Sequence, residues 1–215
     1  MPDIDNHSTA WIAGVAAAIP IDNLDTDQIM PKQFLRIIGK QGLAQGALYD
    51  LRFDGNGEPR RDFVLNRAGY EAPAILLAGS NFGCGSSREH AVWGLQQLGV
   101  KAVIAPSFGE IFFGNAFNNR LALITLEQAS IDALATDIAA EPSHQLQIDL
   151  ESMQVCSPAG RAFRFSMGER NRKMIVEGLD MIGMTLQHRT AIEQFEAEHF
   201  AAAPWMRVLD RRRTV

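Results

Sequence analysis

The sequence predicts a single α/β domain with a partly parallel sheet and flanking helices. Three short apolar runs, at residues 74–78, 100–105 and 121–126, alternate with stretches of helical periodicity, and this alternation favours parallel strands joined by crossover helices. Residues 145–150 alternate polar and apolar side chains, as a half-buried strand does. The chain has 215 residues, of which 47% are hydrophobic and 21% charged. A core can therefore be buried, and no linker divides residues 1–215.

The first part of the chain predicts a strand over residues 11–19. Residues 20–27 form a turn rich in Asn and Asp, whose side chains bond to nearby backbone groups. A short helix is expected over residues 28–38. Residues 50–72 mix charges with Gly and Pro and show no sustained period, which indicates a surface excursion.

The later part of the chain continues the alternation. Ser107 followed by Glu110 has the spacing of a capping box and is expected to open a helix. The remaining expected elements are a helix over 128–140, a hairpin pairing 153–156 with 161–166, and helices near 169–177 and 188–199.

The most informative stretch is residues 79–98, which predicts a strand end, a glycine loop and a helix. Gly83 and Gly85 allow positive φ or a close approach of the backbone to a ligand. Ser86 followed by Glu89 has the spacing of a capping box, so we expect the helix to start there. Free amide donors at a helix start and the planar fork of Arg88 favour an anion, which predicts an anion site with hydroxyl groups beside it.

Net charge, hydropathy and the number of clustered carboxylates exclude several classes of protein. The net charge is −5, and the one basic cluster, Arg211–Arg213, is interpreted as a solvated tail, so no nucleic-acid partner is expected. Residues 10–21 are apolar but have no basic start and are too short to span a bilayer, so a cytoplasmic protein without membrane contact is expected. Asp25 and Asp27 supply too few oxygens for a hard cation, so no metal site is expected in this chain.

The serines allow two further interpretations. Taken as isolated residues, Ser86 and Ser87 are interpreted as helix caps. Ser86 and His90 are one turn apart, but no third residue is placed to orient the imidazole, which disfavours a hydrolase.

Residues 81–90, Asn-Phe-Gly-Cys-Gly-Ser-Ser-Arg-Glu-His, resemble the active-site signature of the small subunits of isopropylmalate dehydratase, the detached swivelling domain of the aconitase superfamily. Four further blocks match in the expected order, at residues 23–35, 105–112, 115–119 and 178–188. The resemblance spans nearly the whole chain. It implies the aconitase swivel-type (β/β/α) fold for a single domain.

The resemblance also implies a role for each residue of the site. Ser86 matches the base that takes a proton from the substrate, Ser87 a residue that hydrogen-bonds the substrate, and Arg88 one that grips a carboxylate. Asp27 matches an aspartate that orients the residues of the site without contacting the substrate itself. Cys84 stands where aconitases proper have glutamate, which favours the isopropylmalate branch. Cys84 and His90 are expected to support the site without contacting the substrate.

The implied activity is a hydro-lyase that interconverts 2-isopropylmalate and 3-isopropylmalate through isopropylmaleate, in leucine biosynthesis. The family uses a [4Fe–4S] cluster, which needs three or four thiolates, whereas this chain has only Cys84 and Cys156. A cysteine-rich large subunit is therefore expected to carry the cluster, in a heterodimer or heterotetramer, with the dicarboxylate substrate at the interface. This chain is expected to bind no cofactor itself.

Residues 36–53 are expected to form a mobile substrate loop. Arg36 and Lys40 are candidates to bind the second carboxylate, although relatives carry arginine near position 40 and lysine lacks its two-point fork. Leu43, Leu48 and Leu51 are expected to line the alkyl group, and Leu51 stands where relatives often carry tryptophan. Two alternatives stay open: a related dehydratase for methylmalate, citraconate or homoaconitate, and a non-catalytic anion-binding regulatory module.

Overall fold

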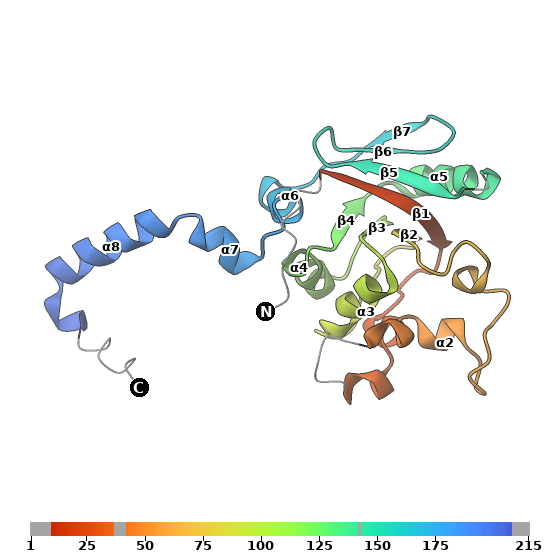
Figure 1. Ribbon diagram of the computed structural model, residues 1–215, viewed down its shortest axis with the longest axis horizontal. Helices are drawn as coiled ribbons and strands as arrows, with labels where there is room; N and C mark the ends of the chain where they lie inside the picture. Colours follow the sequence, from red (N-terminus) through yellow and green to blue (C-terminus); the bar gives the residue numbers. More distant parts are fainter. Residues whose placement is uncertain (1–9, 37–41, 142, 208–215) are drawn as a thin grey trace. The chain divides into compact units, whose positions relative to one another are not determined.

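The computed structural model describes residues 10–36, 42–141 and 143–207 (Figure 1). The chain divides into two compact units, Met1–Leu179 and Asp180–Val215, and each is described by itself. Among the described ranges, no helix combines the length and the apolar character that crossing a bilayer requires.

Within the described residues of the first unit, seven strands form one mixed sheet in the order β4-β3-β2-β1-β5-β6-β7. Strands β4 to β1 run parallel to one another, and β1, β5, β6 and β7 pair antiparallel. The strands are β1 (Trp11–Ile19), β2 (Ile75–Ala78), β3 (Ala102–Ala105), β4 (Ala122–Thr125), β5 (Gln145–Asp149), β6 (Gln154–Cys156) and β7 (Ala162–Arg164).

Strand β1 joins the two halves of the sheet. Its first part pairs antiparallel with β5, from Trp11 opposite Asp149, and its last part pairs parallel with β2, ending with Ile19 opposite Ala78. The carboxyl ends of β1, β2 and β3 therefore lie at one edge. In open α/β sheets, ligands bind outside this edge.

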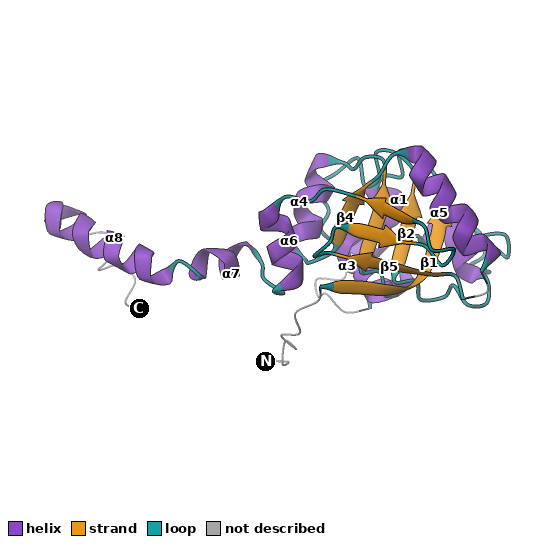
Figure 2. Cartoon of the chain, turned by 90° about the horizontal axis from the view of Figure 1, so that it is seen from above, coloured by secondary structure: helices purple, strands orange, loops and turns teal. Residues whose placement is uncertain are grey.

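Helices lie on both sides of the sheet (Figure 2). Helix α5 packs against β1 and β3, whereas α3 contacts α1, α4 and one of the short 3₁₀ turns. The helices are α1 (Thr26–Ile29), α2 (Tyr49–Arg52), α3 (His90–Leu98), α4 (Glu110–Asn118), α5 (Gln128–Ala140), α6 (Glu169–Val176), α7 (Met181–Leu186) and α8 (Arg189–Ala202). The 3₁₀ turns are η1 (Lys32–Arg36), η2 (Leu43–Gln45) and η3 (Val64–Asn66).

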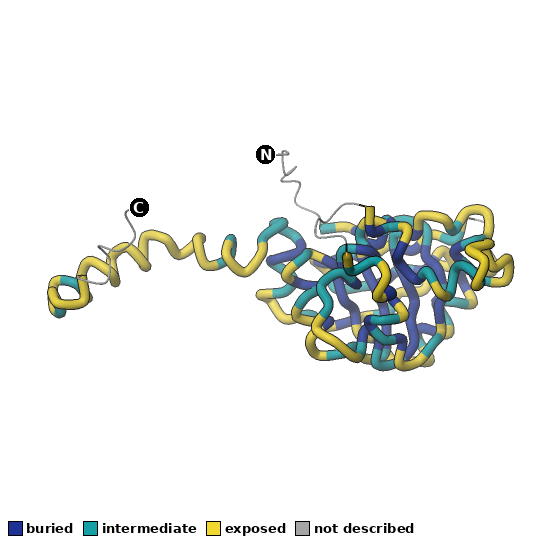
Figure 3. Tube along the Cα trace, turned by 90° about the horizontal axis from the view of Figure 1, so that it is seen from below, coloured by how far each residue is buried: buried dark blue, intermediate teal, exposed yellow. Residues whose placement is uncertain are grey.

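The core is centred on the parallel half of the sheet and extends into the antiparallel half, where Leu146, Ile148 and Val155 are also buried. Every residue of β2 and β3 is buried, as expected for parallel strands covered on both faces. Figure 3 shows the buried residues gathered in these strands, whereas α7 and α8 of the second unit bury no residue.

Several predicted elements are confirmed at their predicted bounds or close to them. Strand 11–19 and helix 128–140 are found as predicted, and the hairpin forms from β6 and β7. The helix predicted over 28–38 is wrong. Asp25 caps a helix that begins at Thr26 and ends at Ile29, because Pro31 disfavours helical backbone at the residue before it.

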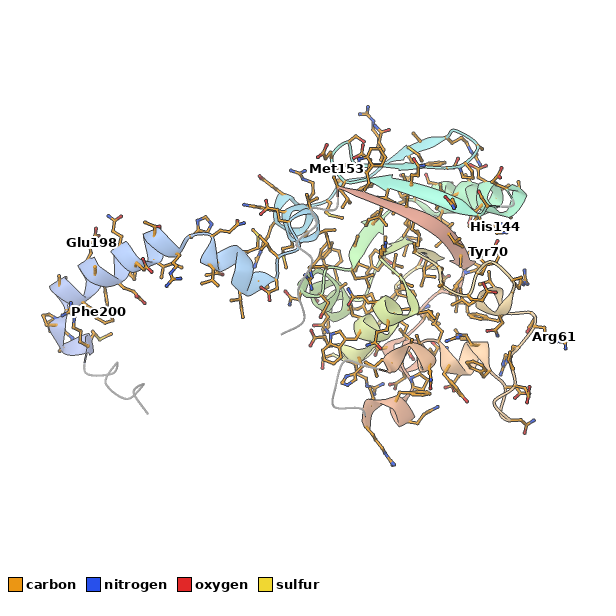
Figure 4. All side chains as sticks on the ribbon, viewed as in Figure 1. Arg61, Tyr70, His144, Met153, Glu198 and Phe200 are labelled. Atoms are coloured by element: carbon orange, nitrogen blue, oxygen red, sulfur yellow. The ribbon has the colours of Figure 1, made fainter. Side chains whose placement is uncertain are left out.

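The excursion at residues 50–72 is irregular apart from the end of α2 and η3. The ring of Tyr70 stacks on the ring of His144, with centroids 4.4 Å apart (Figure 4). Burial raises the pKa of the Tyr70 hydroxyl above its ordinary value. The stack fastens the end of the excursion to the start of β5.

The second unit holds α8, which was predicted, and α7, which was not. Asp180 caps α7 by accepting a hydrogen bond from the Gly183 amide at 2.7 Å. An aspartate in this position is a recognisable start signal, but the glycine inside the helix weakens the periodic pattern.

Candidate active site

Three loops meet at the carboxyl edge of the parallel strands. The loop after β1 is bound to the loop after β2 by backbone hydrogen bonds: the Asn23 amide donates to the Ser80 carbonyl at 2.8 Å, and the Gly83 amide donates to the Leu24 carbonyl at 2.7 Å. The loop after β3 joins them, because the Gly109 amide donates to the Phe82 carbonyl at 2.9 Å. The predicted glycine loop is therefore held from both sides.

Gly109 is required for this arrangement. A Cβ atom at residue 109 would lie 2.6 Å from the Gly83 carbonyl oxygen and 2.9 Å from the Cα atom of Cys84. Both contacts are with backbone, which cannot rotate away as a side chain end can. Only glycine lets the start of α4 come this close to the loop that carries the serines.

The two serines of the signature are exposed, and Ser86 rests on a buried threonine. The Ser86 amide donates to Oγ1 of Thr26 at 3.0 Å, and the two hydroxyl oxygens are 3.1 Å apart. Thr26 is only 1% exposed. Sequence reasoning did not single out Thr26 for any role.

Both capping boxes predicted from serine are wrong. Helix α3 begins at His90, after Glu89, and α4 begins at Glu110, after Gly109; neither start has a side-chain cap. The two hydroxyls have long-range contacts instead, because Ser86 contacts Thr26, and Ser107 Oγ accepts the Asn81 amide at 2.8 Å. The predicted cluster of helix-start amides at Ser86 is therefore displaced to residue 90.

Arg88 follows the serines in the chain and forms an ion pair with Asp27. The Arg88 side chain is 20% exposed, and the Asp27 side chain is 44% exposed. The Nζ atom of Lys32 lies 3.9 Å from the other carboxylate oxygen of Asp27. A guanidinium held in this way, next to two exposed hydroxyls, suits the recognition of a carboxylate.

The segment between the serines and α3 is held by asparagines of α4 and its C-terminal end. Asn119 donates to the Glu89 carboxylate at 2.6 Å and accepts from the Trp93 indole at 2.8 Å. Asn115 donates to the Ser87 carbonyl at 3.5 Å. These asparagines belong to a block that the resemblance matched, but no role was assigned to them from sequence.

Cys84 and His90 lie next to the serines, as the sequence order requires. The Cys84 thiol donates to the Asn23 carbonyl at 3.5 Å, and the His90 ring lies 4.8 Å from the ring of Trp93. The helical spacing that would place His90 against Ser86 does not apply, since Ser86 precedes the first residue of α3. This removes the geometric basis for a serine–histidine pair.

The expected substrate loop is largely structured where it is described. Leu43 and Leu48 are fully buried, so neither side chain is open to a ligand and their prediction as pocket-lining residues is wrong. Leu51 is half-buried. The Leu43 amide donates to Gln97 of α3 at 2.8 Å, which explains why this turn packs on that helix. Arg36 is exposed at the end of η1, and Lys40 lies outside the described residues.

Arg52, the other basic residue of this segment, forms hydrogen bonds with the backbone of the segment itself. Its Nη1 atom donates to the carbonyls of Ala44 and Ala47, both at 3.2 Å, and its guanidinium lies 5.1 Å from the centroid of the Phe53 ring. Burial lowers the pKa of the Arg52 guanidinium from its ordinary value. Arg52 therefore fastens residues 44–53 together.

The residues present do not fit an iron–sulfur cluster. Cys84 lies in the loop after β2 and Cys156 on β6, and a cluster needs at least three thiolates. Among the residues that the structure describes, no group of three His, Cys, Asp or Glu side chains is placed to hold a metal ion.

Family models and known relatives match most of this chain. A family model described as "Aconitase C-terminal domain" matches residues 9–130, and a second, described as the C-terminal domain of the 3-isopropylmalate dehydratase small subunit, matches residues 181–207. A 3-isopropylmalate dehydratase small subunit 1 from Chromobacterium violaceum is 56% identical over 196 residues, covering 91% of this chain and 92% of that protein. A 3-isopropylmalate dehydratase small subunit from Phenylobacterium zucineum is 46% identical over 191 residues, covering 89% and 94%.

A solved structure agrees as well. The crystal structure of a 3-isopropylmalate dehydratase from Methanocaldococcus jannaschii superposes with a TM-score of 0.63 at 28% identity, covering 86% of this chain and 99% of that one. The predicted aconitase-type fold is thereby confirmed. The chain belongs to the family of 3-isopropylmalate dehydratase small subunits, within the aconitase superfamily.

Proposed function

We propose that this chain is the small subunit of a hydro-lyase that interconverts 2-isopropylmalate and 3-isopropylmalate through isopropylmaleate, in cytoplasmic leucine biosynthesis. The observation that carries the proposal is the exposed pair Ser86 and Ser87 beside the half-buried Arg88, on a loop fixed by its neighbours. Family membership supplies the reaction class, since the relatives are named for this dehydratase.

In this proposal, Ser86 is the base. Its oxygen, as the alkoxide, takes the proton from one carbon of the substrate and becomes a neutral hydroxyl, and the C–H electrons form the double bond. The hydroxyl group leaves the neighbouring carbon with its bonding electron pair, which the Lewis acid of the partner subunit would accept. Water then adds back with the opposite orientation to give the isomer. A neutral serine is too weak a base for this step, so the site must stabilise the alkoxide form by charge and hydrogen bonds.

Ser87 and Arg88 bind the substrate. The Ser87 hydroxyl hydrogen-bonds it, and the Arg88 guanidinium takes one carboxylate in a two-point contact. Asp27 holds Arg88 in orientation from behind, through the ion pair between them. Cys84 and His90 shape the surroundings of the serines without touching the substrate.

The site is completed by a cysteine-rich large subunit. That partner would carry the [4Fe–4S] cluster, which supplies a Lewis acid for the leaving hydroxyl group. This chain supplies the proton-transfer and carboxylate-binding groups, so the active site would lie between the subunits of a heterodimer or heterotetramer. Neither protein alone has the full set of groups.

The chain is proposed to act as one swivel-like domain, with residues 36–53 as its substrate loop. Arg36 is exposed and therefore available for the second carboxylate, together with Lys40. The test is hydration of isopropylmaleate by this chain mixed anaerobically with its large subunit, in parallel with each protein alone. Activity of this chain without a partner would contradict the divided site.

A further inference from the structure

We propose that Thr26 is a positioning residue for Ser86, and that its hydroxyl group donates a hydrogen bond that stabilises Ser86 as the alkoxide base. The inference rests on the proposed function, since it assigns a second residue to the same proton transfer. It concerns a side chain to which the family comparison gave no role.

The contacts of the Thr26 hydroxyl converge on a single residue. Its oxygen accepts the Ser86 amide at 3.0 Å, lies 3.1 Å from the Ser86 hydroxyl oxygen and lies 3.4 Å from the Ser86 carbonyl oxygen. The Thr26 hydroxyl is placed to donate to the Ser86 carbonyl at 3.4 Å, and in its closer 3.1 Å contact with the Ser86 hydroxyl either oxygen can be the donor. Once Ser86 has lost its proton it can only accept, so the Thr26 proton is then drawn to the nearer and negatively charged Ser86 oxygen.

Thr26 is itself held firmly in place. It is the first residue of α1, whose start is closed by a complete capping box: the Asp25 carboxylate accepts the Gln28 amide at 2.7 Å, and the Gln28 side chain accepts the Asp25 amide at 3.1 Å. The Thr26 amide donates to the Cys84 carbonyl at 2.8 Å. A β-branched side chain has few rotamers, so a fixed backbone also fixes the hydroxyl group.

Gly85 lets Ser86 reach this hydroxyl. It has a φ of +101°, which L side chains rarely adopt, and a Cβ atom there would lie 3.3 Å from the Thr26 hydroxyl oxygen. The chain therefore turns directly in front of Thr26 and places Ser86 on it. Gly85 of the signature therefore allows the contact between Ser86 and Thr26.

The contact has a chemical consequence because Thr26 is 1% exposed, whereas Ser86 is exposed. A buried donor with a fixed direction loses no free energy to reorientation when negative charge develops on the neighbouring oxygen. Hydrogen bonds to charged groups are stronger than those to neutral ones, so this one strengthens as the serine loses its proton.

The experiment compares Thr26→Val with Thr26→Ser in the full chain, each combined with the large subunit. Valine keeps the shape and removes the hydroxyl group, whereas serine keeps the hydroxyl group and removes the methyl group. Rates are measured with 3-isopropylmalate and with the same substrate carrying deuterium on the carbon that bears the isopropyl group, whose proton the base removes. Thermal unfolding of each variant reports folding separately.

We expect Thr26→Val to lower kcat about 10- to 100-fold with little change in KM, and to raise the deuterium effect, because only proton removal is slowed. Thr26→Ser should stay within about threefold of wild type, since the donor is retained. A loss of activity with an unchanged deuterium effect, an equal loss in both variants, or a Thr26→Val variant that equals wild type would each overturn the proposal. A wild-type pair that fails to turn over isopropylmalate would instead overturn the proposed function itself, and the role of Thr26 with it.

Discussion

Arg88, in the loop after β2, forms an ion pair with Asp27 of helix α1, and Arg88 directly follows the two exposed serines in the chain. The carboxylate fixes the direction of the guanidinium before any substrate is present. In the proposed function, a substrate carboxylate would meet a preoriented fork instead of a mobile side chain.

Replacing Arg88 with lysine should mainly raise KM. Lysine keeps the charge but loses the two-point contact, which costs about 1.5–3 kcal/mol for hydrogen bonds to a charged group. The matched control is Lys32→Ala, since Lys32 also lies near Asp27 but its side chain is 76% exposed. Steady-state kinetics of the reconstituted enzyme test the difference; equal KM values for Arg88→Lys and wild type would exclude Arg88 from carboxylate binding.

Gly109→Ala should lower both the melting temperature and kcat/KM, because its Cβ atom would press on the backbone of Gly83 and Cys84. Gly114→Ala is the control from the adjoining helix. Apart from the chain neighbours and the backbone of the helix itself, no atom lies within 4 Å of a Cβ atom there, and alanine favours a helix over glycine by about 0.5–1 kcal/mol. Thermal unfolding and kinetics should separate the two variants; a silent Gly109→Ala would show that the loops tolerate a wider spacing.

The leucines of the substrate loop should divide into two groups. Leu43→Ala and Leu48→Ala should each destabilise the chain by about 2–5 kcal/mol, since both side chains are fully buried. Leu51→Ala should cost less stability and shift the ratio of kcat/KM toward citraconate relative to isopropylmaleate, by at most about 1–3 kcal/mol. An unchanged ratio in Leu51→Ala would move the alkyl pocket to the large subunit.

Asp137 should make stability depend on pH. Hydrogen bonds from Arg161 and then Ser157 hold the pKa of the Asp137 carboxyl below its usual value; the Arg161 Nε atom donates to it at 2.8 Å. Since the folded pKa is the lower one, the stabilisation is complete above the unfolded pKa of about 3.9 and is lost as the pH falls through the folded pKa.

The test is the melting temperature of wild type and Asp137→Asn across that pH range. The variant should have the lower melting temperature at pH 7, and the difference in melting temperature from wild type should become smaller as the pH falls. Asp132→Asn, an exposed position on the same helix, serves as the control. A gap that stays constant down to about pH 2 would mean that the ionised carboxylate contributes nothing.

Local patterns predicted the elements well, because strand 11–19 and helix 128–140 depend on side chains close together in the chain. The same patterns failed where a long-range partner competes. Ser86 and Ser107 have the spacing of caps but contact Thr26 and the Asn81 amide instead. The capping box that does form, between Asp25 and Gln28, has the expected sequence spacing but was not predicted.

The site was predicted in part, for a similar reason. The signature located the loop of Ser86, Ser87 and Arg88, and the family resemblance supplied their roles, which remain proposals. Thr26 could not be paired with Ser86 from sequence, since the contact joins loops that only the parallel pairing of β1 and β2 places together. The burial of Leu43 and Leu48 likewise follows from packing on α3, which periodicity does not report.

The central claim is that this chain supplies the base to an active site completed by a partner. It is tested most directly by hydration of isopropylmaleate in anaerobic mixtures of the large subunit with wild-type chain or Ser86→Ala, with thermal unfolding as the folding control. We expect the kcat of the Ser86→Ala mixture to be lower than that of the wild-type mixture by at least about a thousandfold, with the melting temperature of the chain nearly unchanged. Activity of Ser86→Ala within about tenfold of wild type would contradict the account.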